Sequence, residues 1–159
     1  MGAKGEWMAE QFEKKVQEAI ATLKKLSDAD WKKMTGAEKW SVGVTAHHLA
    51  GGLGAVAGIV TAVAAGQFRS DFTRAKLDEM NAAHARENAN CTKAETIALL
   101  EKGAAQAAAV LRDLSDKQLA TSGTVFVEVP PMTVEQLVHG GLIGHLDEHF
   151  GSIRKTVGI

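Results

Sequence analysis

The stretch from Ser41 to Gln67 carries no fixed charge, and it restricts the possible folds of this chain more than any other feature. Its sequence is SVGVTAHHLAGGLGAVAGIVTAVAAGQ, which is long enough to cross a bilayer, and Gly54 and Gly58 form the G-x-x-x-G pattern of membrane helix dimers. However, alanine and glycine dominate the segment, and two histidines interrupt its first half. We therefore expect a helix buried inside a soluble bundle rather than a membrane span, with small residues that let neighbouring helices approach closely.

Composition supports a soluble helical protein. The chain has 159 residues, enough for one domain with a hydrophobic core, and we expect residues 1–159 to form a single domain. Abundant alanine, 2 prolines and the absence of tyrosine favour helices over sheets. A formal net charge of -1 gives no general attraction to nucleic acid or to an anionic membrane. Cys91 is the one cysteine, which excludes an intramolecular disulfide, and the charged N-terminus has no signal-peptide pattern, so we expect a cytoplasmic protein.

Apolar periodicity and capping patterns predict an all-α fold. Apolar residues recur at three- and four-residue spacing with charged residues between them, as in amphipathic helices. Ser41 is placed to cap one helix, and the pairs Thr92/Glu95 and Thr133/Gln136 match capping boxes. We expect helices over residues 6–26, 41–66, 73–87, 92–114 and 133–157, with one possible helical turn in 27–40 and a short extended hairpin in 121–133.

Two histidines near the C-terminus lie one helical turn apart. His145 and His149 share a helix face with Leu142 and Ile153, so both imidazoles point toward the core. Residues four apart on a helix have Cβ atoms about 6 Å apart, a separation that two imidazoles can close onto one ion. The pair therefore suggests a metal site, and bridged core histidines are the alternative.

A third ligand is available from the uncharged helix. His48 lies on a line with Val44 and Ile59, which is the more apolar face, whereas His47 lies about 100° away among small residues. His48 is therefore the better ligand, and Gly51 and Gly52, one turn further on, leave room for bound water or substrate beside it. The remaining histidines are each interpreted as structural or solvated: His47, His84 and His139.

Two segments resemble the DinB-like superfamily, also called the YfiT-like metal-dependent proteins. KWSVGVTAHHL (39–49) is similar to the entry into the second helix of that family, where a metal-binding histidine follows a tryptophan by eight residues, here Trp40 and His48. MTVEQLVHGGLIGHLDEHFGSIRKTVG (132–158) resembles the family's last helix, which carries H-x-x-x-H and then a Gly-x-Ile-type sequence. The matching residues there are His145, His149, Gly151 and Ile153.

The resemblance implies a four-helix bundle with a crossover connection that binds a divalent metal, zinc or nickel, through His48, His145 and His149. Many members of the superfamily are homodimers, so it also implies a homodimer. Relatives include mycothiol-dependent maleylpyruvate isomerases and bacillithiol S-transferases. In the isomerase branch a glutamate ligand is usual where this chain has His145. The superfamily's name refers to DNA damage, but the near-zero charge argues against DNA contact.

These features together predict a metal-dependent enzyme that activates a small thiol or water against a small-molecule electrophile, as a thiol S-transferase or a hydrolase. The thiol would be a low-molecular-weight cofactor, because Cys91 lies in a predicted loop. Asp147 and Glu148 point away from the ligand face, so no general base is assigned. The alternative function is a stress-associated, non-catalytic metal-binding bundle. Three residues are candidates for the pocket mouth or for the core: Trp40, Phe126 and Met132.

Overall fold

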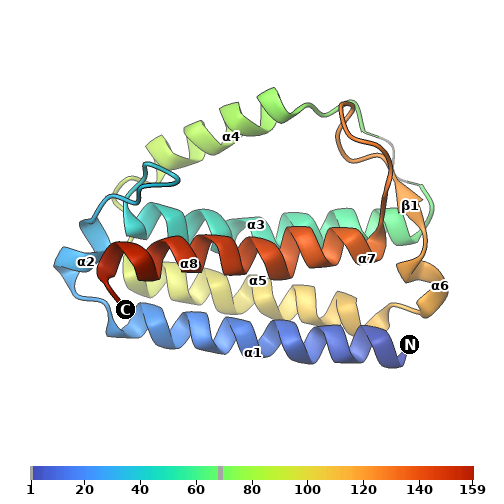
Figure 1. Ribbon diagram of the computed structural model, residues 1–159, viewed down its shortest axis with the longest axis horizontal. Coiled ribbons are helices and arrows are strands. Elements are labelled where there is room, and N and C mark those ends of the chain that lie inside the picture. Colours follow the sequence, from blue (N-terminus) through green and yellow to red (C-terminus); the bar gives the residue numbers. More distant parts are fainter. Residues whose placement is uncertain (1, 68–69) are drawn as a thin grey trace.

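Four long helical segments lie side by side and form a bundle in the computed structural model, which describes residues 2–67 and 70–159 (Figure 1). They are α1 (Ala3–Lys25), α3 (Val42–Ala64), α5 (Lys93–Asp113) and a C-terminal run made of α7 (Val134–Leu137), η1 (Val138–Gly144) and α8 (His145–Val157). Helices α3 and α5 run in the same direction, opposite to α1 and α8 (Figure 1). The chain returns between α3 and α5 through α4 (Arg74–Glu87), which is the crossover. The predicted four-helix bundle with a crossover is therefore confirmed.

Short elements make the remaining connections. Helix α2 (Asp28–Lys32) is the predicted single turn, and β1 (Ser122–Gly123) pairs antiparallel with β2 (Met132–Thr133) as the predicted hairpin, although its strands have only two residues each. Helix α6 (Asp116–Leu119) was not predicted. Its capping box, formed by Ser115 and Gln118, is readable in the sequence.

The predicted starts of α3, α5 and α7 are the observed ones, whereas α1 begins at Ala3 and not at residue 6. The Ser41 hydroxyl accepts a hydrogen bond from the backbone N–H of Val44, which satisfies one of the free donors at the start of α3. Both predicted capping boxes form, at Thr92 for α5 and at Thr133 for α7. Because these side chains replace the missing backbone partners, the helices begin where the sequence places the caps.

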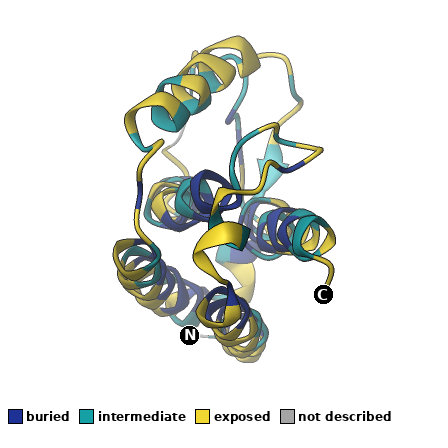
Figure 2. Cartoon of the chain, turned by 90° about the vertical axis from the view of Figure 1, so that its left-hand side faces the viewer, coloured by how far each residue is buried: buried dark blue, intermediate teal, exposed yellow. Residues whose placement is uncertain are grey.

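The core lies between the four long segments. Phe12 and Leu23 of α1, Leu53 of α3 and Phe150 of α8 are among the largest fully buried side chains. Exposed residues lie on the outer faces of the helices (Figure 2). Helix α3 is, within the described residues, the one helix long and apolar enough to cross a membrane. Its apolar side chains instead belong to the core cluster of the bundle, as expected for a core helix.

The small residues of α3 serve close packing only in part, which corrects our expectation. A Cβ at Gly43 would collide with the Trp31 ring, so the absence of a side chain is needed there. A Cβ at Gly52 or Gly58 would have no atom within 4 Å. These two glycines therefore do not form a seam between tightly packed helices.

The last helix is not α-helical throughout. Residues 138–144 form a π-helical segment directly before His145, where we expected one continuous α-helix. A Cβ at Gly144 would lie 2.8 Å from the carbonyl oxygen of His139, a separation that real Cβ atoms essentially never show. A π-helical turn changes which face the following residues present, and such turns often occur at functional sites. This segment therefore affects which face of the C-terminal run carries His145 and the residues of α8.

Candidate metal centre

Three histidines from two helices meet inside the bundle. His48 of α3 and His145 and His149 of α8 each offer one potential ligand atom, and these atoms all lie within 4.8 Å of one another. The ring centroids of His145 and His149 are 4.4 Å apart, and that of His48 is 5.4 Å and 5.1 Å from them. We call this group the histidine trio. The structure thus brings together the three residues that the sequence selected as ligands.

The surroundings of His48 and His145 favour neutral imidazoles at these two positions. Burial, and then repulsion from His149, His145 and other nearby imidazoles, lowers the pKa of His48 to about 4. Burial and His149 likewise lower the pKa of His145 to about 4. A neutral imidazole has a free lone pair on one ring nitrogen, which is the form that binds a metal ion. At neutral pH the two rings are therefore ready to act as ligands without first losing a proton.

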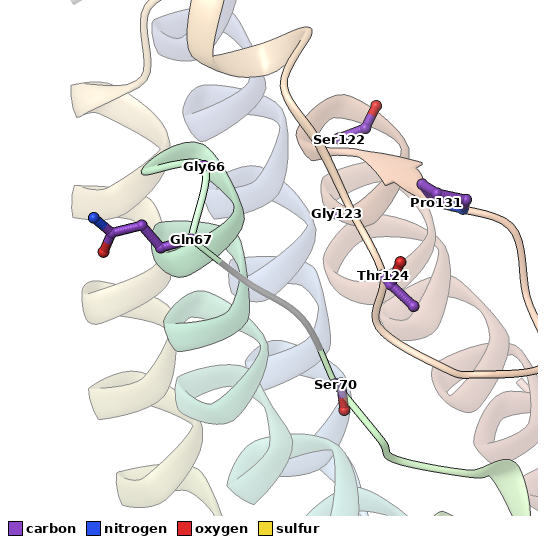
Figure 3. Close-up of a pocket in the computed structure, with 7 residues that line it drawn as sticks. All are labelled: Gly66, Gln67, Ser70, Ser122, Gly123, Thr124 and Pro131. Carbon is purple, nitrogen blue, oxygen red and sulfur yellow. The ribbon is translucent and has the colours of Figure 1, made fainter.

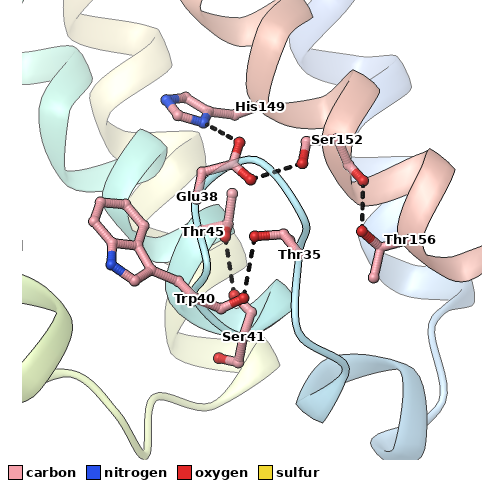
Figure 4. A network of polar contacts seen from close by, with 8 residues as sticks. All are labelled: Thr35, Glu38, Trp40, Ser41, Thr45, His149, Ser152 and Thr156. Atoms are coloured by element: carbon pink, nitrogen blue, oxygen red, sulfur yellow. Dashed lines mark hydrogen bonds and ion pairs between the residues drawn. The ribbon is translucent and has the colours of Figure 1, made fainter.

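Glu38 fixes the orientation of His149 (Figure 4). One carboxylate oxygen, Oε1, lies 2.9 Å from His149 Nδ1, and the other, Oε2, accepts a hydrogen bond of 2.6 Å from the Ser152 hydroxyl. Burial raises the pKa of the Glu38 carboxyl, but the hydrogen bonds from Ser152 and His149 outweigh it and the pKa is lowered. The ionised carboxylate keeps the proton of His149 on Nδ1, which leaves Nε2 free to face a metal, the arrangement typical of metal-binding histidines.

Glu38 was not predicted from the sequence, although it lies close to the Trp40 motif, because its contact with His149 joins residues far apart in the chain. Glu38 precedes Trp40 by two residues, in the loop that leads into α3. Within this loop the Thr35 hydroxyl donates to the Trp40 carbonyl oxygen, and the Thr35 N–H donates to the same oxygen at 2.8 Å (Figure 4). The loop is therefore folded against itself and holds the carboxylate beside α8.

Of the three candidates for a pocket mouth, Trp40 is the one that lies against the trio. Its ring contacts the His48 ring edge-on, with centroids 5.1 Å apart. Phe126 instead stacks on Phe72, which lies just before the start of α4. Met132 is partly buried and packs against the core cluster.

A second histidine pair lies beside the trio. His47 Nδ1 of α3 and His84 Nε2 of α4 are 2.8 Å apart, and the ring centroids of His84 and His48 are 5.9 Å apart. Burial lowers the pKa of both His47 and His84. The sequence indicates a structural or solvated role for each of them taken singly, and no signal in it pairs them. His139, in contrast, is exposed, as expected for a solvated histidine.

The carboxylates next to the ligands point outward, as the helical wheel predicted. Asp147 and Glu148 are exposed, and Asp147 accepts hydrogen bonds from Lys15. The thiol of Cys91 is buried, which raises its pKa, and its backbone carbonyl accepts a hydrogen bond from Trp31 Nε1. Neither the two carboxylates nor the cysteine supplies a reactive group to the trio.

A separate hollow of about 590 Å³ lies at the other end of α3 (Figure 3). Its lining residues are Gly66, Gln67, Ser70, Ser122, Gly123, Thr124 and Pro131. None of the lining side chains within residues 2–67 and 70–159 is ionisable, so these residues offer no acid, base or strong metal ligand. Among the residues that the structure describes, the group of side chains that could hold a metal ion is the histidine trio.

Comparisons with known proteins agree with this fold. Residues 12–140 match the family model described as the mycothiol maleylpyruvate isomerase N-terminal domain. The matched region contains His48 and ends before His145 and His149. Among curated proteins, none matches the sequence significantly.

A solved structure has a similar fold over nearly the whole chain. A mutant of mycothiol-dependent maleylpyruvate isomerase superposes with a TM-score of 0.64 at 10% sequence identity, covering 96% of this chain and 57% of the isomerase chain. At this identity the match concerns the fold, and the chain spans just over half the length of that isomerase. The family model, however, covers well over half of the sequence. The chain therefore belongs to the mycothiol maleylpyruvate isomerase N-terminal domain family, whose fold is DinB-like.

Proposed function

We propose that this protein is a metal-dependent enzyme in which His48, His145 and His149 bind one divalent ion, zinc or nickel. The observation that carries the proposal is the convergence of three potential ligand atoms within 4.8 Å, with Glu38 hydrogen-bonded to one of the rings. Three neutral imidazoles leave the positive charge of such an ion uncompensated and at least one coordination position open. The donor set therefore fits a catalytic rather than a purely structural zinc site.

When bound, such an ion lowers the pKa of a coordinated water or thiol toward neutrality and so supplies a nucleophile. The residues of this chain would hold the ion and orient the groups around it. Glu38 keeps His149 in one tautomer, Trp40 covers one side of the His48 ring, and Gly52 leaves space one turn along α3. We propose a thiol S-transferase or hydrolase reaction on a small molecule.

The cosubstrate in the S-transferase version is a low-molecular-weight thiol. The descriptions of the matched family and of the superposed isomerase both name mycothiol. The thiol of Cys91 is buried and so is unsuited to act as the reacting thiol. We further propose that the protein works in the cytoplasm as a homodimer, without nucleic acid or membrane as a partner.

Metal analysis of the purified protein tests the first step. We expect about one divalent ion per chain in the wild type, and loss of that ion together with a lower Tm in His145→Ala. His139→Ala is the matched control, because it removes an exposed histidine from the same helical run. Wild-type protein that binds no zinc, nickel or cobalt at micromolar concentration would refute the metal site.

A non-catalytic metal-binding protein is the second candidate, and one observation favours it. The carboxylate nearest the trio, Glu38, is already engaged by His149 and Ser152 and so has no free oxygen that is poised as a base. Turnover assays with several low-molecular-weight thiols and a chlorinated or nitroaromatic substrate separate the two. A metal-dependent rate supports the enzyme, as an S-transferase where the rate also requires a thiol and as a hydrolase where it does not. Metal binding with no metal-dependent rate supports the alternative.

A further inference from the structure

Helix α4 approaches the trio with a single face. None of residues 74–87 is buried, and the partly buried positions along its length include Leu77, Asn81 and His84. These recur at four- and three-residue spacing, so they form one stripe that is turned toward the bundle. Figures 1 and 2 show α4 lying over α3, apart from the four packed segments. His84 is the one titratable side chain of this stripe.

The two ring nitrogens of His84 have different surroundings. Nε2 lies 2.8 Å from His47 Nδ1, so one of these two nitrogens donates to the other. Nδ1 is fully enclosed and has no hydrogen-bond partner within residues 2–67 and 70–159. A buried polar atom without a partner costs about 1–3 kcal/mol, so such atoms usually have a water or a ligand as partner.

This atom belongs to a ring that lies beside His48 of the trio. The centroid of the His84 ring is 5.9 Å from that of His48, with the ring planes inclined at 69°. His84 is not one of the three residues whose potential ligand atoms lie within 4.8 Å of one another. It is therefore close enough to touch a small group bound at the trio, and too far to complete the ligand set itself.

Open space adjoins the same part of α3. Gly52 follows His48 by one helical turn, and a Cβ built there would meet no atom within 4 Å. The small residue leaves room beside the His48 ring, on the helix that α4 overlies.

We propose that His84 Nδ1 forms a hydrogen bond with the exogenous group that occupies the open metal position, and that His47 holds the His84 ring in place for this. The inference rests on the proposed metal site and assigns a ligand-binding role to a residue outside it. Depending on which nitrogen of the His47–His84 pair carries the proton, Nδ1 accepts from a bound water or thiol, or donates to a bound thiolate. In either case removal of the ring weakens the bound group.

The test uses the full-length protein loaded with Co²⁺, whose visible absorption reports ligand exchange at the metal. 2-Mercaptoethanol is the probe, titrated at fixed pH into wild type, His84→Leu and Asn88→Ala. Asn88 donates from its side chain to the His84 carbonyl oxygen, so its variant perturbs the same end of α4 without touching the imidazole. We expect the Kd for the probe to rise about tenfold or more in His84→Leu, as for loss of a hydrogen bond to a charged group, and to stay within about twofold in Asn88→Ala.

Three results contradict the inference in distinguishable ways. Equal probe affinity in wild type and His84→Leu, with both loaded with cobalt, refutes the role of His84 and leaves the metal site intact. Equal weakening in both variants shows that His84 only fastens α4, which also refutes it. Failure of wild type to bind Co²⁺ refutes the metal site and this inference together.

A second measurement does not depend on the variant folding. In ¹⁵N-labelled, zinc-loaded wild type, the Nδ1 resonance of His84 should shift when 2-mercaptoethanol saturates the protein, and that of the exposed His139 should not. An unchanged Nδ1 resonance at saturation would overturn the proposal.

Discussion

Helices α3 and α4 both contribute to the surroundings of the histidine trio, but they are held in opposite ways. Helix α3 lies in the bundle with Leu49, Leu53 and Val60 fully buried, and with α5 and α8 packed against it. Helix α4 has no buried residue in 74–87 and is fastened at its ends. At one end His84 bonds to His47, and at the other the Phe72 carbonyl oxygen accepts from the backbone N–H of Val127.

The candidate metal ligands and the proposed contact to the exogenous group come from helices that differ in packing. The candidate ligands come from α3 and α8, where close packing fixes side-chain positions to within a small range. The group that we propose to contact the exogenous ligand comes from α4, where few buried contacts oppose motion. The candidate ligands therefore lie on closely packed helices, and the helix above them has few buried contacts.

Leu53→Ala in α3 is expected to give the largest effect, a loss in the free energy of unfolding that tests the close packing of this helix. Leu53 is 1% exposed, and truncating a buried leucine removes packing and leaves a cavity, which costs about 2–5 kcal/mol of the free energy of unfolding. Urea denaturation of the metal-free protein measures it. A loss below about 1 kcal/mol would show that α3 is not the packed core helix described here.

Features that depend on local sequence patterns were predicted, and features that depend on tertiary contacts were not. The bundle, the caps of α3, α5 and α7 and the choice of His48 over His47 follow from apolar periodicity and short motifs, which are local properties of the chain. Glu38 and the His47–His84 bond were not predictable, because each joins residues that only the tertiary fold brings together. The π-helical segment was missed because its residues have the same apolar pattern as an α-helix, and only the glycines at 140, 141 and 144 set it apart.

A second, smaller effect is expected from Glu38→Gln, which tests how rigid the ligand side is. The amide has no charge to keep the proton of His149 on Nδ1, and it weakens the bond that orients the ring. Loss of such a supporting carboxylate typically lowers metal affinity about 10- to 100-fold. Competition with a zinc chelator measures the Kd. Glu148→Gln is the control, since Glu148 is exposed on the same helix as His149, and an equal effect in both would refute the positioning role of Glu38.

The pH dependence of metal-free protein should be weaker still, because His48 and His145 are only partly buried. Their pKa values are lowered to about 4 in the folded protein, whereas unfolded histidine titrates near 6.5. Between these values the unfolded chain binds more protons, so stability rises with pH from about 4 to about 6.5 and is lost as pH falls through this range. Urea midpoints measured from pH 7 to pH 4 report it.

The double variant His48→Gln, His145→Gln provides the control for that measurement. Glutamine does not titrate, so the part of the slope between pH 6.5 and pH 4 that is due to these two rings should disappear. If stability changes with pH equally in wild type and the double variant, the pKa values of the two rings are not lowered by folding.

The smallest effect is expected in α4 itself, from Leu77→Ala. Leu77 is half-buried on the stripe that faces the bundle, and α4 buries nothing else that the truncation would uncover, so the free energy of unfolding should fall by about 1 kcal/mol or less. Amide hydrogen exchange gives the more sensitive reading, because segments with few buried contacts open locally at low free energy. We expect amides of α4 to exchange well before those of α3 in wild type, and Leu77→Ala to accelerate exchange in α4 alone. Protection of α4 equal to that of α3 would remove the distinction between a packed and a fastened helix.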